Sequence, residues 1–227
     1  MVISVLIFDF DGLLMDTETT LFECWRYEWR QHGLELDPAR FFADHGGDVT
    51  EQRYAELARA VGPGYDRAAS HARRIAYREE LHATLGPAPG ISEWFAEAAG
   101  LGLRLAVASS SPTHWVHGHL TRAGLLSRFE VVACGDEVTG HKPDPAVYLL
   151  ALRRLGIAPE AAVAFEDTPH GVAAARAAGL RCVAVPNPYA ARDRFGAADM
   201  VLRSAATTTL TRLLGELAAP SPAAGRR

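Results

Sequence analysis

The apolar residues of this chain follow two kinds of pattern, which alternate along most of its length. Short, uninterrupted apolar runs bounded by glycine, proline or polar residues are typical of strands buried inside a parallel sheet. Longer stretches with apolar positions three and four residues apart predict amphipathic helices. The apolar runs predict strands over residues 5–8, 103–108, 129–133, 161–165, 182–185 and 200–202.

Helical stretches separate the later strands, and most of them are closed by a glycine, the residue that most often ends a helix. They predict helices over residues 91–100, 113–123, 145–155, 169–178 and 207–217. Regular alternation of strand and helix is typical of a doubly wound parallel sheet with helices on both faces. We therefore predict an α/β fold.

One long segment, residues 18–86, breaks this alternation because it contains only helical spacing. An apolar stripe that includes Trp25 and Trp29 predicts a helix whose aromatic side chains pack in a helical layer. The proline- and glycine-rich residues 86–90 mark the return of the chain to the sheet. We predict a core of residues 1–17 and 87–218, an all-helical insertion of residues 18–86, and a disordered tail of residues 219–227.

Composition and charge exclude several classes of protein. The 227 residues are 48% hydrophobic, which is ordinary for a globular protein with a full core. The net charge is −4 and no basic run is present, so neither nucleic acid nor an anionic membrane is an expected partner. The three cysteines are far apart, no basic leader precedes the first strand, and no apolar run could span a bilayer. We expect a cytoplasmic monomer with reduced thiols.

Two carboxylates, Asp9 and Asp11, follow the first predicted strand directly. In an extended segment they point to the same side, and Gly12 then allows the chain to turn away. Open α/β sheets bind ligands at the carboxyl ends of their strands. Because like charges so close repel each other, a cation between them would stabilise the pair, and oxygen ligands suit Mg²⁺. The alternative is a solvated acidic turn.

Polar residues also follow three later strands. Ser109 and Ser110 precede a helix, where hydroxyl and backbone N–H groups favour an anion, although a simple capping cluster is the alternative. Lys142 stands just before a helix that begins with proline, which fixes its direction. Glu166 and Asp167 end a buried strand, where they could also stabilise a helix N-terminus. The carboxyl ends of parallel strands bring such residues together.

These four sites resemble, in order, the four motifs of the haloacid dehalogenase superfamily. Residues 9–12 with Asp16-Thr17-Glu18 resemble the first motif, and more narrowly that of sugar-phosphate phosphatases and β-phosphoglucomutase-like enzymes. The resemblance extends to about residue 202. It implies a Rossmann-like core, with a mobile helical cap where this chain has its insertion. We expect the cap to turn on hinges near residues 15–18 and 85–90.

The resemblance implies a role for each motif residue. Asp9 is expected to be the nucleophile that forms an aspartyl-phosphate, and Asp11 the general acid and base. Ser109 is expected to bond a phosphoryl oxygen, and Lys142 to neutralise both the phosphate and the nucleophile. The full set of expected phosphate- or substrate-binding residues is Phe10, Ser109, Ser110, Lys142, His45, Gly46 and Gly47.

The same resemblance implies a magnesium site. Asp9, the backbone carbonyl of Asp11, and Asp167 are the expected ligands, and water fills the remaining positions. Glu166 acts through water or orients Lys142. A phosphomonoester dianion repels a carboxylate nucleophile, and a divalent cation together with a lysine offsets that repulsion.

Three functions fit these residues. A phosphatase for a small phosphorylated metabolite is the leading interpretation. A phosphomutase of the β-phosphoglucomutase type would use the same core. A receiver-type signalling module also has a phospho-accepting aspartate, but it needs no helical insertion after its first strand. β-Phosphoglucomutases carry a histidine five residues after the aspartate that matches Asp16, where this chain has Leu21. We therefore predict a hydrolase.

The substrate itself cannot be deduced from the sequence. The cap loop at residues 45–48 is expected to select it, together with Arg53 and either Arg73 or Arg74. An arginine at such a position suits a second phosphate or a carboxylate.

Overall fold

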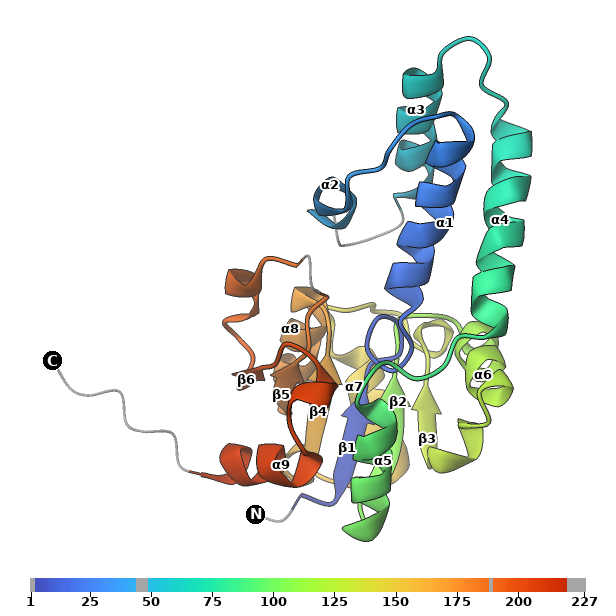
Figure 1. The fold of residues 1–227 in the computed structure, drawn as a ribbon. Helices are drawn as coiled ribbons and strands as arrows, with labels where there is room; N and C mark the ends of the chain where they lie inside the picture. The colour runs from blue at the N-terminus through green and yellow to red at the C-terminus, as the bar shows by residue number, and fades with distance from the viewer. Residues whose placement is uncertain (1–2, 44–48, 188–189, 220–227) are drawn as a thin grey trace, which may run out of the picture.

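Six parallel strands form the centre of the protein (Figure 1). The computed structural model describes residues 3–43, 49–187 and 190–219. The spatial order is β3-β2-β1-β4-β5-β6, so the first strand lies inside the sheet, with β2 and β3 on one side of it and β4, β5 and β6 on the other. The strands are β1 (Val5–Phe8), β2 (Arg104–Ala108), β3 (Val131–Ala133), β4 (Ala162–Glu166), β5 (Arg181–Ala184) and β6 (Met200–Val201). The predicted doubly wound parallel sheet is confirmed.

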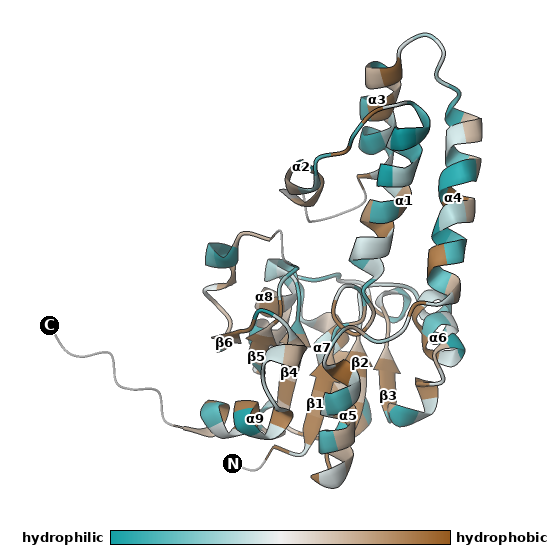
Figure 2. Cartoon of the chain, viewed as in Figure 1, coloured by the Kyte–Doolittle hydropathy of each residue, from teal (hydrophilic) through white to brown (hydrophobic). Residues whose placement is uncertain are grey.

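The two faces of the sheet carry separate hydrophobic cores. Because side chains alternate along a strand, Leu6 and Phe8 of β1 face one core while Val5 and Ile7 face the other. Helices α5 (Ile91–Gly100), α6 (Thr113–Arg122) and α9 (Leu210–Ala218) cover the first face. Helices α7 (Ala146–Leu155) and α8 (Pro169–Ala177) cover the second. The strands are mostly apolar, as Figure 2 shows, because both of their faces are buried; the charged residues Arg104, Glu166 and Arg181 stand only at strand ends.

The predicted helical insertion is also present. Between β1 and α5 lie α1 (Thr17–Gln31), α2 (Pro38–Ala43), α3 (Thr50–Val61) and α4 (Arg67–Ala83). They extend away from the carboxyl ends of the strands (Figure 1), and α1 and α4 pack side by side. We call these four helices the helical unit. It has an aromatic core of its own, which contains Trp25, as the apolar stripe predicts.

Short 3₁₀ turns connect several elements, at Leu126–Arg128, Gly135–Glu137, Pro159–Ala161, Arg192–Phe195 and Ala205–Thr207. The third strand is shorter than its apolar run predicts: its pairing with β2 begins only at Val131, opposite Ala106. Of the helices in the described ranges, none is long and apolar enough to cross a lipid bilayer. The predicted cap-loop residues His45, Gly46 and Gly47, and residues 220–227 of the predicted tail, lie outside the described residues.

Candidate active site

Asp9 lies at the carboxyl edge of the sheet, immediately after the central strand β1. Its backbone N–H donates to the carbonyl of Phe165 at 2.9 Å, which continues the pairing of β1 with β4 by one residue. Ser109 follows β2 in the same way, and its N–H donates to the carbonyl of Ala133 at 3.0 Å. Sheet hydrogen bonds thus fix the backbone on which these two side chains stand.

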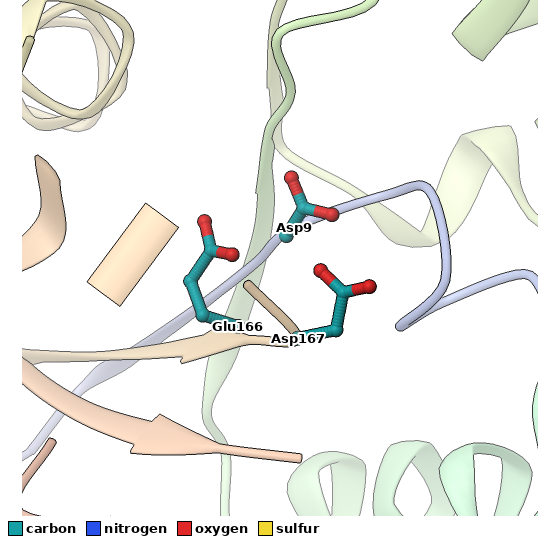
Figure 3. Close-up of side chains that lie close together, drawn as sticks. All are labelled: Asp9, Glu166 and Asp167. Atoms are coloured by element: carbon teal, nitrogen blue, oxygen red, sulfur yellow. The ribbon is translucent and has the colours of Figure 1, made fainter. Parts of the chain in front are cut away.

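Three buried carboxylates, those of Asp9, Glu166 and Asp167, converge at this edge. Figure 3 shows their side chains facing a common space, and one oxygen of each lies within 4.8 Å of the others. Lys142 reaches the same group, with a side chain that is 6% exposed. Its Nζ donates to Asp9 Oδ1, to Glu166 Oε1 at 2.6 Å and to the backbone carbonyl of Ala108 at 2.9 Å. The structure therefore brings together four of the residues predicted from the sequence.

Glu166 is fully buried, and one of its oxygens accepts two hydrogen bonds. Its Oε1 also accepts a hydrogen bond of 2.6 Å from the hydroxyl of Tyr148 on α7. Its Oε2 lies against Gly171 in the first turn of α8, where an added Cβ would come within 1.9 Å. A larger residue at this position would displace the Glu166 carboxylate. With Oε1 bonded to both Tyr148 and Lys142, Glu166 is placed to orient the lysine.

The charges in this group do not balance. Burial raises the pKa of Asp9 to about 8, an increase that the Lys142 ammonium opposes and the Glu166 carboxylate adds to. Burial, and next the charge of Asp9, also raise the pKa of Asp167 well above its ordinary value. The pKa of Lys142 is lowered by burial but raised more strongly by Asp9 and Glu166. One buried ammonium thus faces three buried carboxylates.

A divalent cation fits this excess of buried negative charge. The available donors are carboxylate and backbone oxygens, the ligands that Mg²⁺ prefers over the nitrogen and sulfur ligands of zinc. Asp9 and Asp167 are the carboxylates suited to bind it directly, because Glu166 Oε1 already accepts from both Lys142 and Tyr148 and its Oε2 lies against Gly171, whereas Lys142 contacts Asp9 through Oδ1 alone. These residues therefore fit the cation that the sequence predicts.

The turn after Asp9 depends on Gly12. Its φ of +80° lies in the left-handed region, which glycine adopts without the strain of a Cβ. An added Cβ would also come within 2.2 Å of Asp167 Oδ2. The predicted role of Gly12 in turning the chain is thus accompanied by a second one, which is to leave space for the acidic group.

Asp11 stands apart from the three buried carboxylates and is held by three donors. Its Oδ1 accepts from Thr17 Oγ1 at 2.8 Å and from Trp115 Nε1 at 3.0 Å. Its Oδ2 accepts from Ser111 Oγ at 2.6 Å. Sequence reasoning did not identify Trp115 or Ser111 as partners of Asp11. Ser111 directly follows the predicted pair Ser109 and Ser110, but the sequence gives no sign that the indole of Trp115 points at Asp11.

The other predicted phosphate-binding residues of the sheet edge differ in how far their side chains are exposed. Ser109 is buried, and its Oγ accepts from the N–H of Ser111 at 3.0 Å, whereas Ser110 is exposed. Both serines line the cleft described below. The side chain of Phe10 is fully buried in the core of the sheet. Only its backbone can therefore make the phosphate contact that the sequence predicts.

A cleft of about 910 Å³ separates the helical unit from the edge of the sheet. Leu21 of α1 and Arg53 of α3 line it from one side, and Asp9, Asp11 and Lys142 from the other. Among the described residues, the group predicted to carry the chemistry thus opens on a space large enough for a small metabolite.

Of the three arginines expected to face the substrate, only Arg53 lines the cleft. Arg73 instead pairs with the buried Glu28 at 2.6 Å, between α4 and α1. Arg74 is buried inside the helical unit, where its Nε donates to the hydroxyl of Tyr54 at 2.8 Å. The prediction for Arg73 or Arg74 was wrong because both side chains are used to join helices.

Comparison with known proteins places this geometry in a family. Residues 6–185 match the family model described as haloacid dehalogenase-like hydrolase. The chain is 36% identical to YhcW of Bacillus subtilis, which is described as a phosphatase, over 95% of this chain and 98% of YhcW. It is 33% identical to hexitol phosphatase B of Escherichia coli, over 92% and 96%.

A solved structure shows the same fold. The HAD family hydrolase of Deinococcus radiodurans, with bound phosphate and sodium, superposes with a TM-score of 0.79 at 27% identity, covering 95% of this chain and 96% of that one. With 95% of this chain covered in each case, the similarity in sequence to YhcW and in structure to the Deinococcus hydrolase spans both the sheet and the helical unit. The protein is therefore an enzyme that belongs to the haloacid dehalogenase-like hydrolase family, and within it to the phosphatase type.

Proposed function

We propose that this protein is a Mg²⁺-dependent phosphomonoester hydrolase that acts on a small phosphorylated metabolite through an aspartyl-phosphate on Asp9. The observation that carries this proposal is the contact of Asp9 with Lys142, beside Asp167, at the end of the central strand. The similarity to hexitol phosphatase B supports a sugar or polyol phosphate as substrate, and the phosphate bound by the Deinococcus hydrolase supports a phosphate site.

The first step is attack of Asp9 on phosphorus. Lys142 touches the carboxylate of Asp9 and offsets the repulsion between that carboxylate and the incoming dianion. Ser109 and the exposed Ser110, at the entrance to α6, supply hydroxyl and backbone donors to phosphoryl oxygens. Glu166 and Tyr148 keep the lysine aimed at the reacting atoms. Asp9 leaves this step as the aspartyl-phosphate.

Asp11 acts as the acid and then as the base. It donates a proton to the leaving alkoxide, and afterwards takes one from the water that hydrolyses the aspartyl-phosphate. It lines the same cleft as Asp9 but lies outside the group of three buried carboxylates. Its own hydrogen bonds come from neutral donors, which distinguishes its surroundings from those of Asp9.

Asp9, Asp167 and the backbone carbonyl of Asp11 would hold Mg²⁺, which offsets the negative charge of the phosphoryl group when it is bound. We propose further that residues 18–86 form a cap domain over a core of residues 1–17 and 87–218. Cap movement about residues 15–18 and 85–90 would exclude bulk water from the cleft during the first step.

Removal of the metal tests the cation site. We expect phosphate release to stop in EDTA and to return when excess Mg²⁺ is added. Ca²⁺ should not restore it, because its larger and looser coordination shell places Asp9 poorly for in-line attack. The measurement is phosphate release from a panel of hexose, hexitol and pentose phosphates. Full activity in the chelator would contradict the assignment of Asp9 and Asp167 as metal ligands.

A hydrolase is favoured over a mutase by Leu21. This side chain lines the cleft and packs against the aromatic core of the helical unit, and it can neither donate nor accept a proton. A bound sugar phosphate therefore lacks the group that would activate its hydroxyl at this position, and water attacks the aspartyl-phosphate instead. The family match and the helical insertion leave the receiver-type alternative without support. The monomeric state and the cytoplasmic location stay predictions.

The preference for water can be measured directly. With β-glucose 1-phosphate and a trace of the 1,6-bisphosphate, we expect no glucose 6-phosphate to accumulate. Phosphate release from the best member of the panel should be faster than any such conversion. The opposite order of rates would show that the enzyme is a mutase.

A further inference from the structure

The indole of Trp115 is joined to the proposed acid and base, Asp11, across a large separation in sequence. Its Nε1 donates to Asp11 Oδ1 at 3.0 Å. Trp115 lies in the first turn of α6, is partly buried, and lines the cleft together with Asp11. The proposed reaction steps use Asp11 but give no role to this hydrogen bond from Trp115.

The direction of the indole is fixed by the rings around it. The ring of His119, one helical turn further along α6, lies 4.4 Å from it between centroids, and the ring of His82 on α4 lies 5.3 Å away. His82 is itself held by a 2.9 Å hydrogen bond with Thr20 Oγ1 on α1. Thr113, at the start of α6, is anchored by Asp136 through its N–H at 3.0 Å and its hydroxyl at 2.8 Å. The donor therefore has little freedom to turn away from Asp11.

The three donors to Asp11 are not equivalent. The hydroxyls of Thr17 and Ser111 can rotate, and each can accept as well as donate a hydrogen bond. The indole N–H can only donate. Asp11 Oδ1 thus receives two donors, Thr17 and Trp115, whereas Oδ2 receives the Ser111 hydroxyl among the described residues. When Asp11 is protonated, its proton is therefore placed on Oδ2.

We propose that Trp115 is a positioning residue for general acid catalysis: its N–H fixes the Asp11 carboxyl so that the proton for the leaving group is carried on Oδ2. The inference rests on the proposed function, because it takes Asp11 as the acid. In this role the indole acts through Asp11. Loss of the indole N–H should therefore lower kcat/KM more for substrates whose leaving group must be protonated than for substrates whose leaving group departs without a proton.

The test is Trp115→Phe, which keeps an aromatic ring between His82 and His119 but removes the N–H. We would measure kcat/KM, which covers the steps up to formation of the aspartyl-phosphate, with two substrates. The alkyl phosphate hydrolysed fastest in the panel has a leaving group that needs a proton, and p-nitrophenyl phosphate has one that does not. We expect kcat/KM to fall about tenfold for the alkyl ester, as for loss of one hydrogen bond to a charged group, and less than about twofold for the aryl ester.

Trp94→Phe is the matched control. The indole of Trp94 also donates one hydrogen bond, of 3.0 Å to the carbonyl of Thr208, but it packs in the core of the sheet and is not among the residues that line the cleft. The ratio of the two kcat/KM values should not change in this variant. Because the ratio is taken within one preparation, a smaller folded fraction lowers both values equally and leaves the ratio intact.

Asp11→Asn separates this inference from the proposed function. If Asp11→Asn lowers kcat/KM far more for the alkyl ester while Trp115→Phe lowers both substrates equally or neither, the role of Trp115 is overturned and that of Asp11 stands. If Asp11→Asn itself does not discriminate between the two substrates, Asp11 is not the acid and both assignments are overturned. Selective loss in both variants, with no change of ratio in Trp94→Phe, supports the inference.

Discussion

Replacement of Asp9 by asparagine is expected to reduce phosphate release by at least about a thousandfold, which corresponds to about 4 kcal/mol of activation free energy. The reason is chemical, because an uncharged carboxamide oxygen is a poor nucleophile towards phosphorus. The fold should persist, since the change removes one of three clustered buried carboxylates near a single buried lysine, which pairs directly with Asp9 and Glu166. We expect the midpoint of thermal unfolding to stay the same or to rise.

Asp66→Asn is the matched control for this variant. Asp66 caps the N-terminus of α4 by accepting from the N–H of Ala69 at 3.0 Å, and asparagine caps a helix about as well. Its activity should equal that of the parent enzyme. If the turnover rate of Asp9→Asn stays within tenfold of the parent rate, too much activity remains for an enzyme that has lost its nucleophile. That result would contradict the proposed mechanism.

Replacement of Lys142 by methionine is expected to affect both stability and activity. Methionine is similar in length but leaves Asp9 and Glu166 without their shared cation in a buried site. Removing one partner of a buried ion pair costs about 3–5 kcal/mol, and we expect a loss of this order in the free energy of unfolding. We also expect kcat/KM to fall about a hundredfold or more, because a donor that stabilises charge in the transition state is lost.

Urea unfolding with and without Mg²⁺ measures the first effect. Bound Mg²⁺ should recover part of the stability of Lys142→Met, because a ligand that binds only the folded state stabilises it. Arg212→Met is the control: its guanidinium pairs with Glu216 at 2.7 Å, but that pair is exposed and should contribute little to stability. Equal losses of unfolding free energy in the two variants would contradict a special stabilising role for the buried ion pairs of Lys142.

The elements that carry the site could be predicted because they depend on local patterns. A buried strand such as β1 is a continuous apolar run, and the residues just after it must lie at the edge of the sheet. Parallel strands place all such edges together, so Asp9, Lys142 and Asp167 could be assigned to one site before any distance was known. The separate core of the helical unit followed in the same way from the stripe that contains Trp25.

The contacts that hold these residues in place could not be predicted, because they depend on how distant helices pack. Tyr148 lies in the apolar stripe of α7, where an aromatic side chain is ordinary core, and only the fold shows that its hydroxyl reaches Glu166. Arg74 belongs to a charged helix, and its spacing gives no sign that Trp25 and Tyr54 enclose it. The position of the Trp115 ring likewise depends on how His82 of α4 packs against α6, which the sequence does not show.

The central claim is that Asp9 carries the phosphoryl group during turnover, and trapping that group tests it most directly. The enzyme would be mixed with Mg²⁺ and an excess of the best substrate, stopped with acid within one turnover, digested, and examined by mass spectrometry. We predict one phosphoryl group on the peptide that contains Asp9, absent from Asp9→Asn and retained in Asp66→Asn. A phosphoryl group on a different residue, or none on any peptide while phosphate is being released, would contradict the account.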